Sequence, residues 1–480
     1  MSTHESSSYP LVQLKDLTVS NIDKRGPYEE DEFIYVDISS IDNKAKLIVA
    51  PKRLPVSEAP SRAKQRLQAG DVLVSMTRPN LNAVAIVPNE LAGAIGSTGF
   101  HVLRAAEEVD PKWLYFGVQS HDFVSEMSGL VQGALYPAVR PKDINTFKLP
   151  APPIDQQKRI VAEIEKQFSR LDEGIDNLKR VQANLKRYKA AVLKAAVEGS
   201  LVETEAEIAR REGRDYETGE QLLQRILQER RRRWEEAELA KMQAKGKPPK
   251  NDKWKQKYKE PAAPDTTHLP ELPEEWVWAS LNSICEHVVD CPHSTPRFQA
   301  NGRPCIDTTW MTPDGLVADR ARYVDSETYE ARITRLIPKP GDIVFAREGT
   351  IGTAVLVPQG MMPCLGQRVM LLRTSRLFSN AYLRYVLHSE TVKQQYRKQA
   401  LGSTVAHINV RDVKAFKVPV PPLAEQHRIV TEVDRRLSIL RETEVQVEAN
   451  LQRAERLRQS ILAAAFSGRL VSDDSLDSVA

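Results

Sequence analysis

The chain has 480 residues, a net charge of only +4 and four cysteines, all of them in its second half. So few cysteines in a 54 kDa chain exclude a disulfide framework and indicate a reduced, cytoplasmic protein. No apolar run approaches the roughly 20 residues of a membrane span, and the N-terminus lacks the basic-then-apolar pattern of a signal peptide.

The sequence repeats itself over long range. Residues 150–202 and 419–471 align without a gap at an offset of 269 residues. Weaker matches precede them at offsets of 269 to 271, such as Gly70-Asp71-Val72 with Gly341-Asp342-Ile343. A long-period repeat predicts two copies of one structural unit and a pseudo-two-fold molecule. Each copy is a divergent globular portion followed by a better-matched helix.

The globular portions are predicted to be mixed α/β. In the first, short β-branched runs predict strands at 33–36, 71–75 and 83–87, and residues 113–127 predict a helix. In the second, the corresponding strands are expected at 342–345 and 369–372, and the helix at 382–399.

Two long helices are predicted after these portions, because apolar residues recur there with heptad spacing. Pro152-Pro153 and Pro421-Pro422 mark the helix starts, and Gly199 and Gly468 stand where left-handed C-terminal caps belong. Each helix should have about 44 residues and be roughly 66 Å long. The apolar stripe comprises Val161, Ile164, Phe168, Leu171, Ile175 and Leu178 in the first helix and Val430, Val433, Leu437, Leu440, Val447 and Leu451 in the second.

A narrow apolar stripe with charged flanks needs a partner, and the other copy of the helix is the nearest one. We predict an antiparallel coiled coil between the two helices. The alternatives are that each helix packs only on its own domain, or that the two helices pair in parallel.

Residues 201–270 separate the two copies. Residues 216–244 are helix-like, and residues 245–270 are rich in Lys and Pro and predict a poorly packed linker. The arginine run 230–233 is interpreted as a solvated helix face, the alternative being a nonspecific contact with DNA or a partner.

In its repeat and in several motifs the chain resembles the specificity subunits of type I restriction–modification enzymes. The resemblance depends on the Pro-Pro-x-x-x-Gln helix starts at 152–157 and 421–426, on Gln-x-Arg-Ile-Val at 426–430 with its copy at 157–161, on the Gly-rich stretch 341–352, on Gly-Ser-Thr at 402–404 and on the stretch 272–278. The first unit departs from this pattern, since residues 75–80 replace the Arg-x-Gly-Thr-Ile-Gly turn and Gly133-Ala134-Leu135 replaces Gly-Ser-Thr.

The resemblance implies two tandem target recognition domains separated by the two helices. Their expected bounds are 1–153 for domain 1, 154–200 for the first helix, 201–270 for the linker, 271–421 for domain 2, 422–471 for the second helix and 472–480 for a tail. It also implies a noncatalytic subunit that reads a bipartite DNA site and docks two methyltransferase subunits. Motor–nuclease subunits would complete the complex, and S-adenosylmethionine, ATP and Mg would be bound by the partner subunits.

Candidate DNA contacts are cations, amides and hydroxyls near Gly-rich turns, because phosphates need cations and base edges need forked donors or amides. In domain 1 the candidates are Arg78, as the counterpart of Arg347, together with Asn80, Asn82, Tyr136, Arg140 and Lys142. In domain 2 they are His293, Thr295, Arg347, Thr350, Gln367, Arg368, Ser403, Thr404, His407 and Arg411. The alternative for each is an ordinary surface side chain or turn.

Two further observations bear on chemistry. The spacing of Cys285, His287, Cys291 and His293 matches no zinc module, so no metal site is predicted. No G-x-x-x-x-G-K-[ST] loop and no Asn-Pro-Pro-aromatic methyltransferase motif occurs, which favours a noncatalytic role. The rival hypothesis is a coiled-coil adaptor that joins protein partners without contacting DNA.

Overall fold

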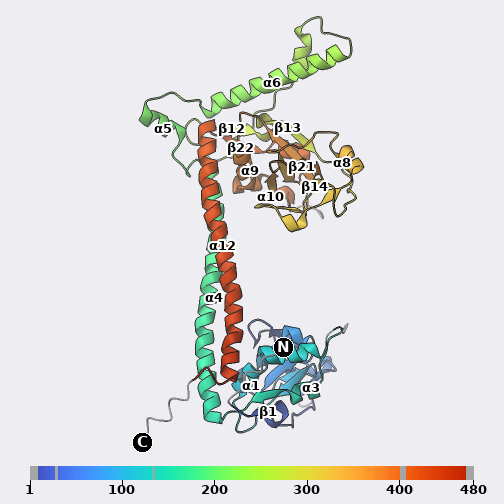
Figure 1. Cartoon of the computed structure of the whole chain (residues 1–480), viewed down its shortest axis with the longest axis vertical. Helices are drawn as coiled ribbons and strands as arrows, with labels where there is room; N and C mark the ends of the chain where they lie inside the picture. The colour runs from blue at the N-terminus through green and yellow to red at the C-terminus, as the bar shows by residue number, and fades with distance from the viewer. Residues whose placement is uncertain (1–8, 28–30, 132, 134–135, 401–406, 472–480) are drawn as a thin grey trace. The chain divides into compact units, whose positions relative to one another are not determined.

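The computed structural model describes residues 9–27, 31–131, 133, 136–400 and 407–471, and the chain divides into two compact units. Unit 1 comprises Met1–Val181 and Gln446–Ala480, and unit 2 comprises Gln182–Val445. Each unit contains a mixed α/β domain and one part of each long helix (Figure 1). The predicted mixed α/β fold with two long helices is therefore confirmed.

The domain of unit 1 is built around two sheets. One is antiparallel, with strand order β10-β7-β8, and the other is mixed, with strand order β5-β2-β9-β6. Its strands are β1 Leu11–Gln13, β2 Glu32–Val36, β3 Ile41–Asp42, β4 Leu47–Ile48, β5 Lys52–Pro55, β6 Ala63–Arg66, β7 Val72–Ser75, β8 Val84–Ile86, β9 Ile95–Ser97, β10 Phe100–Leu103 and β11 Lys148–Pro150. Its short helices are α1 Pro111–Gly117, α2 His121–Gly129 and α3 Pro141–Thr146.

Unit 2 repeats this plan around a sheet with strand order β13-β21-β18-β19. Its strands are β12 Val277–Ser280, β13 Cys285–Asp290, β14 Arg303–Ile306, β15 Met311–Thr312, β16 Gly315–Leu316, β17 Tyr323–Val324, β18 Ile343–Ala346, β19 Ala354–Leu356, β20 Cys364–Leu365, β21 Val369–Thr374 and β22 Lys417–Val420. Its short helices are α7 Leu281–Ile284, α8 Ser326–Arg332, α9 Asn380–His388, α10 Glu390–Ala400 and α11 Val410–Lys414.

The central strands of both units alternate between two hydrophobic cores, as strands buried on both faces must. In unit 2, Ile343 and Phe345 face the core that contains α9, whereas Val344 and Ala346 face the core beneath β14. The same ion pair closes the start of both sheets. Asp71 accepts two hydrogen bonds from Arg104 at 2.7 and 2.8 Å, and Asp342 accepts two from Arg373 at 2.8 and 2.7 Å.

The long helices are α4 Ile154–Val197 and α12 Leu423–Phe466, each of the expected 44 residues. In unit 1 the first part of α4 packs against the last part of α12, where the Arg458 guanidinium lies 4.4 Å from the Phe168 ring and pairs with Asp172. In unit 2 the last part of α4 packs against the first part of α12 in one core with Val192 and Val433. The helices are therefore antiparallel in each unit (Figure 1).

The predicted stripe faces inward. The side chains of Val161, Ile164, Phe168, Val433, Leu437, Leu440 and Val447 are buried, and those of Leu171, Ile175, Leu178, Val430 and Leu451 are half-buried. Both helices end in the same way, because Gly199 and Gly468 have φ of +70° and +80°. The amides of Ser200 and Arg469 then bond back to carbonyls five residues earlier.

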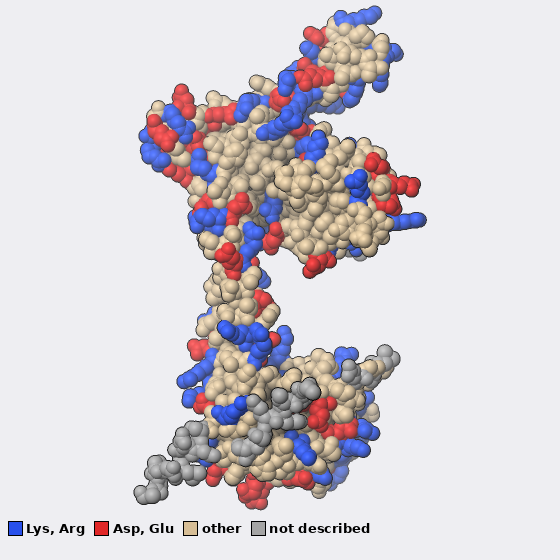
Figure 2. Space-filling view, in the orientation of Figure 1, with Lys and Arg blue, Asp and Glu red and all other residues tan. Residues whose placement is uncertain are grey.

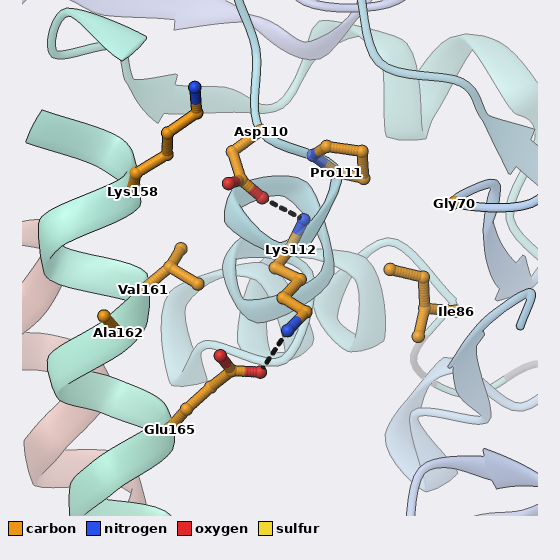
Figure 3. A pocket seen from close by; sticks show the side chains of 9 residues that line it. All are labelled: Gly70, Ile86, Asp110, Pro111, Lys112, Lys158, Val161, Ala162 and Glu165. Atoms are coloured by element: carbon orange, nitrogen blue, oxygen red, sulfur yellow. Dashed lines mark hydrogen bonds and ion pairs between the residues drawn. The ribbon is translucent and has the colours of Figure 1, made fainter. Parts of the chain in front are cut away.

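Figure 3 shows how α4 is attached to the domain of unit 1, around a cavity of about 400 Å³. The first turn of α1 faces α4 there. Asp110 caps α1 by accepting a hydrogen bond from the backbone amide of Lys112 at 2.8 Å, and the Lys112 Nζ donates to Glu165 on α4 at 2.6 Å. The C-terminal end of α12 also packs against α1, since the rings of Trp113 and Phe466 lie 4.6 Å apart.

Two predictions of local structure are wrong. The single helices expected at 113–127 and 382–399 are each broken in two, because Ser120 and Ser389 adopt extended backbone with ψ of 150° and 158°. The prediction that residues 245–270 are poorly packed is wrong for part of that segment. Trp254, in the 3-10 segment Asp252–Lys257, and Tyr258, just after it, pack on Trp234.

The segment between the copies contains α5 Glu205–Glu212 and α6 Gly219–Ala244. Two arginines of the 230–233 run dock α6 on the domain of unit 2, so the run is only partly a solvated face. Arg230 donates to the carbonyl oxygen of Asn282 at 2.8 Å and to that of Cys285. Arg233 pairs with Glu286.

None of the described helices is long and apolar enough to cross a membrane.

Candidate nucleic-acid interface

Several predicted DNA contacts of unit 2 lie together at one edge of its sheet, where two strands end and the strand between them begins. Strand β13 ends at Asp290, β18 ends at Ala346 and β21 begins at Val369, and these positions are adjacent in the sheet register. The loops that leave them therefore lie side by side. We call residues 291–295, 347–350, 367–368 and 407 the loop edge of unit 2.

Arg347 was predicted to approach DNA, but the structure builds it into the scaffold of this edge. The residue is only 5% exposed. Its guanidinium donates to Asp290 Oδ1 at 2.6 Å and to the carbonyl oxygen of Ile408 at 2.9 Å. The side chain thus joins the end of β13 to the segment before α11, while its buried Nε has no hydrogen-bond partner among the described residues.

Two further arginines, which the sequence analysis missed, hold the same loop. Arg332 at the end of α8 is buried and donates to the carbonyl oxygens of Leu365 at 2.6 Å, Ser294 at 3.0 Å and Pro292 at 3.3 Å. Arg335 donates to those of Asp290 and Cys291, both at 3.2 Å. No motif surrounds either arginine in the sequence, so only the fold reveals their role.

The side chains left at the surface of the loop edge are polar and partly preorganised. The hydroxyl of Thr295 donates to Gln367 Oε1 at 2.8 Å, and Gln367 Nε2 donates to the carbonyl oxygen of His293 at 3.2 Å. These bonds fix the orientation of the Gln367 amide. The His293 side chain is 72% exposed and lies 3.3 Å from Asp290.

Arg368 completes this group. It has φ of +71°, a strained value for a residue other than glycine, and its side chain is half exposed and lies 3.6 Å from Glu348. Such strain is tolerated where the surrounding structure determines it. Thr350 and His407 are also exposed at this edge. An isolated β-bridge to Glu348 holds His407 there. Ser403 and Thr404 lie outside the described residues.

Unit 1 has an equivalent loop edge with the same backbone framework. The amide of Met76 donates to the Gly99 carbonyl at 3.0 Å, as the amide of Arg347 donates to the Arg368 carbonyl at 2.9 Å. Thr77 forms an isolated β-bridge with Ala138, as Glu348 does with His407. Arg78 was predicted to be the counterpart of Arg347. The prediction is two residues out, since Met76 occupies that place and Arg78, with φ of +48°, corresponds to Gly349 with φ of +68°.

The other predicted contacts of unit 1 lie around this edge or on α3. Asn80 and Tyr136 are exposed, Tyr136 at 87%, and Asn82 is half-buried with φ of +45°. The amide of Arg78 donates to the Pro137 carbonyl at 2.8 Å, which places the Arg78 and Tyr136 segments together.

Two cations mark equivalent short helices. Lys142 is the second residue of α3 and Arg411 the second of α11, and both are exposed. Arg140, just before α3, pairs with Asp143 at 3.2 Å, and this hydrogen bond lowers the pKa of the Asp143 carboxyl.

The long helices offer a second kind of surface. Large apolar side chains remain exposed on them outside the paired stripe: Val181 and Leu457 in unit 1, and Tyr188, Ile439 and Val445 in unit 2. Contiguous exposed apolar patches mark protein–protein contact sites, so these side chains are candidates for such a contact.

Cys285, His287, Cys291 and His293 do not form a cluster that could hold a metal ion. Cys285 and Cys291 lie at opposite ends of β13 and belong to different hydrophobic cores. Burial raises the pKa of the Cys285 thiol. Among the described residues, no three His, Cys, Asp or Glu side chains are placed to hold a metal ion.

Comparison with known proteins shows what this chain is similar to. Residues 273–450 match the family model of the type I restriction modification DNA specificity domain. The chain is 22% identical to the type I restriction enzyme EcoKI specificity subunit of Escherichia coli (strain K12), over 89% of this chain and 79% of that protein.

Two solved structures share the fold. A chain from a study of complex assembly and conformational transition in a type I R-M system has a TM-score of 0.71 at 24% identity, with 96% of this chain and 98% of that chain covered. The HsdS subunit from Thermoanaerobacter tengcongensis has a TM-score of 0.55 at 24% identity, with 96% and 97% covered. The resemblance to specificity subunits of type I restriction–modification systems is therefore confirmed.

Proposed function

We propose that this chain reads a bipartite DNA sequence, one half-site with each loop edge. The observation that carries the proposal is that both edges share one backbone framework and differ in their side chains. Met76, Thr77 and Arg78 stand in unit 1 where Arg347, Glu348 and Gly349 stand in unit 2. A common scaffold with different polar groups suits two readers of different sequences, because base edges are distinguished by the donors and acceptors that meet them.

The best candidates for base contacts in unit 2 are Gln367, Arg368 and His293. An oriented amide such as that of Gln367 can pair with adenine, and a guanidinium such as that of Arg368 can pair with guanine. Arg411 in unit 2 and Lys142 in unit 1 are candidates for phosphate contacts, since both are exposed cations beside an edge loop. In unit 1 the candidates for base contacts are Arg78, Asn80 and Tyr136.

The paired helices would set the separation of the half-sites and dock two methyltransferase subunits. The apolar side chains left exposed on α4 and α12 support the docking role. Adenine methylation and, with motor–nuclease subunits, DNA cleavage would be carried out by those partners, which would bind S-adenosylmethionine, ATP and Mg. This chain would supply sequence choice and assembly.

The test is to co-express the chain with its cognate methyltransferase and to map methylated adenines across the genome of the host. The proposal predicts methylation at a single bipartite motif with a fixed nonspecific spacer. Assembly with the methyltransferase but no methylation and no retention of duplex DNA at low salt would instead indicate a protein adaptor.

A further inference from the structure

The positive charge of this chain is concentrated in one segment of unit 2 that the repeat does not contain. Residues 241–259 contain eight lysines and one aspartate, a formal charge of +7, whereas the whole chain has +4. The rest of the chain is therefore slightly acidic. We call residues 241–259 the lysine arm; Figure 2 shows blue side chains along α6 and around its far end.

The lysine arm is ordered by contacts with α6. The rings of Trp254 and Trp234 stack at 6.0 Å, and Tyr258 packs on Trp234 at 5.3 Å. Lys255 pairs with Asp252 at 3.2 Å and with Glu235 of α6 at 3.8 Å. The arm thus folds back on the helix, and the aromatic side chains are used within it.

Six lysines of the arm are exposed and have no ion pair or hydrogen bond from their side chains to described residues: Lys245, Lys247, Lys250, Lys253, Lys257 and Lys259. Elsewhere on α6 most of the arginines are neutralised by carboxylates, as Arg232 is by Glu229 at 2.8 Å and Glu236 at 2.9 Å. Mutual repulsion of unpaired lysines costs stability unless a polyanion binds them.

The helix that leads into the arm, α6, is attached to the same strand that leads to the loop edge. Arg230 and Arg233 fasten α6 beside Cys285 and Glu286 at the start of β13. The strand ends five residues after Cys285, at Asp290, where the loop edge begins, roughly 17 Å away for a strand of this length. A DNA duplex and an acidic protein surface are both possible partners for such charge.

The side chains of the arm favour DNA. Protein interfaces are built around a buried apolar or aromatic centre, but the large apolar side chains of the arm, Met242, Trp254 and Tyr258, are half-buried rather than exposed. Phosphate binding needs only mobile cations and no sequence readout. We propose that the lysine arm is a second, sequence-independent DNA-binding site that holds the duplex backbone separately from the loop edges.

The test is a salt titration of the full-length chain on a random-sequence duplex, followed by fluorescence anisotropy. Each phosphate contact contributes about 0.9 to the slope of log K against log salt. Replacing all six unpaired lysines by glutamine should reduce the slope by about three to five. Replacement of the same six by arginine keeps the charge and should leave the slope near its original value.

An unchanged slope in the six-glutamine variant overturns the proposal. Loss of methyltransferase co-purification with an unchanged slope overturns it too, and assigns the arm to an acidic protein. A smaller variant, in which Lys245, Lys247 and Lys250 are changed to Gln, guards against misfolding. Its slope should fall by about half as much, which corresponds to the loss of up to about three phosphate contacts. In this variant the methylated sequence should stay the same. Failure of the arm and failure of sequence reading are therefore distinguishable.

Discussion

The side-chain oxygen of Gln426 accepts a hydrogen bond from the backbone amide of Ser379 at 2.9 Å, and its amide nitrogen donates to the Pro421 carbonyl at 2.9 Å. Gln157 makes the same two bonds, with the amide of Asp110 at 2.9 Å and with the Pro152 carbonyl at 2.8 Å. Each glutamine of the Pro-Pro-x-x-x-Gln motif is buried and joins a long helix to the start of α9 or α1.

Replacing Gln426 by Leu should therefore loosen the junction between α12 and the domain of unit 2. The change leaves a buried carbonyl and a partly buried amide without partners, at about 1–3 kcal/mol each. We expect a loss of about 3 kcal/mol in the free energy of unfolding of unit 2, measured by urea denaturation. Ser438→Leu, at an exposed position of the same helix in unit 2, is the control and should have little effect.

The ion pairs Asp71–Arg104 and Asp342–Arg373 should both be structural. The carboxylates are nearly fully buried, and each arginine is mostly buried. Asp342→Asn should destabilise unit 2 by about 3–5 kcal/mol, because it leaves a buried guanidinium without its counterion. Glu236→Gln removes an exposed pair and should cost under about 1 kcal/mol. Equal stability of the two variants in urea would contradict this account.

His388 should make unit 2 sensitive to acid. Burial, reinforced by the charge of Arg384, lowers the pKa of His388 to about 3, and the Nε2 atom accepts a hydrogen bond from the Ala354 amide at 2.9 Å. Lys393 and Lys189 also face the ring and lower its pKa, whereas Asp314 raises it. The imidazole therefore stays neutral in the folded state.

The unfolded state takes up a proton on this histidine near pH 6.5, well above the folded pKa. Stability is therefore fully present above pH 6.5 and is lost as the pH falls toward 3. Between pH 7 and 5 the contribution of His388 should fall by about 2 kcal/mol. His388→Gln should flatten the dependence of stability on pH in this range, and the exposed His427→Gln should leave it unchanged. A parallel profile for His388→Gln would rule out the explanation.

The loop edge of unit 2 separates readers from scaffold. Gln367→Ala should change which bases are methylated at one half-site, since it removes an oriented amide, at about 1–3 kcal/mol of discrimination. Arg347→Ala should instead lower stability without a new sequence preference, because it removes the buried guanidinium that pairs with Asp290 and bonds to the Ile408 carbonyl. Methylation mapping and urea denaturation of both variants check the distinction, and a new methylated sequence with Arg347→Ala would contradict it.

Much of the scaffold could be predicted because its signals are local. The prolines and glycines fix both ends of α4 and α12, and the heptad spacing identifies the buried stripe. The central strands β7, β18 and β21 were also placed within a few residues, since β-branched runs mark buried strands.

The site could be predicted only in outline, because its contacts join distant segments. The partner of Arg347 is Asp290, 57 residues away, and nothing near Arg347 in the sequence indicates that pair. The counterpart of Arg347 in unit 1 was misplaced because two weakly similar turns were aligned by residue type rather than by backbone. The packing of Trp254 on Trp234 likewise depends on a reversal of the chain that Lys and Pro content does not indicate.

The most direct test of the account is to insert one heptad into each long helix, after Val181 in α4 and after Val445 in α12. A heptad keeps the apolar stripe in phase and lengthens each helix by about 10 Å, or about three base pairs of duplex. Methylation mapping should then show both half-sites unchanged and the spacer longer by about three base pairs. An unchanged spacer with active methylation, or altered half-sites at the original spacing, would contradict the proposal that the helices set the distance between two readers.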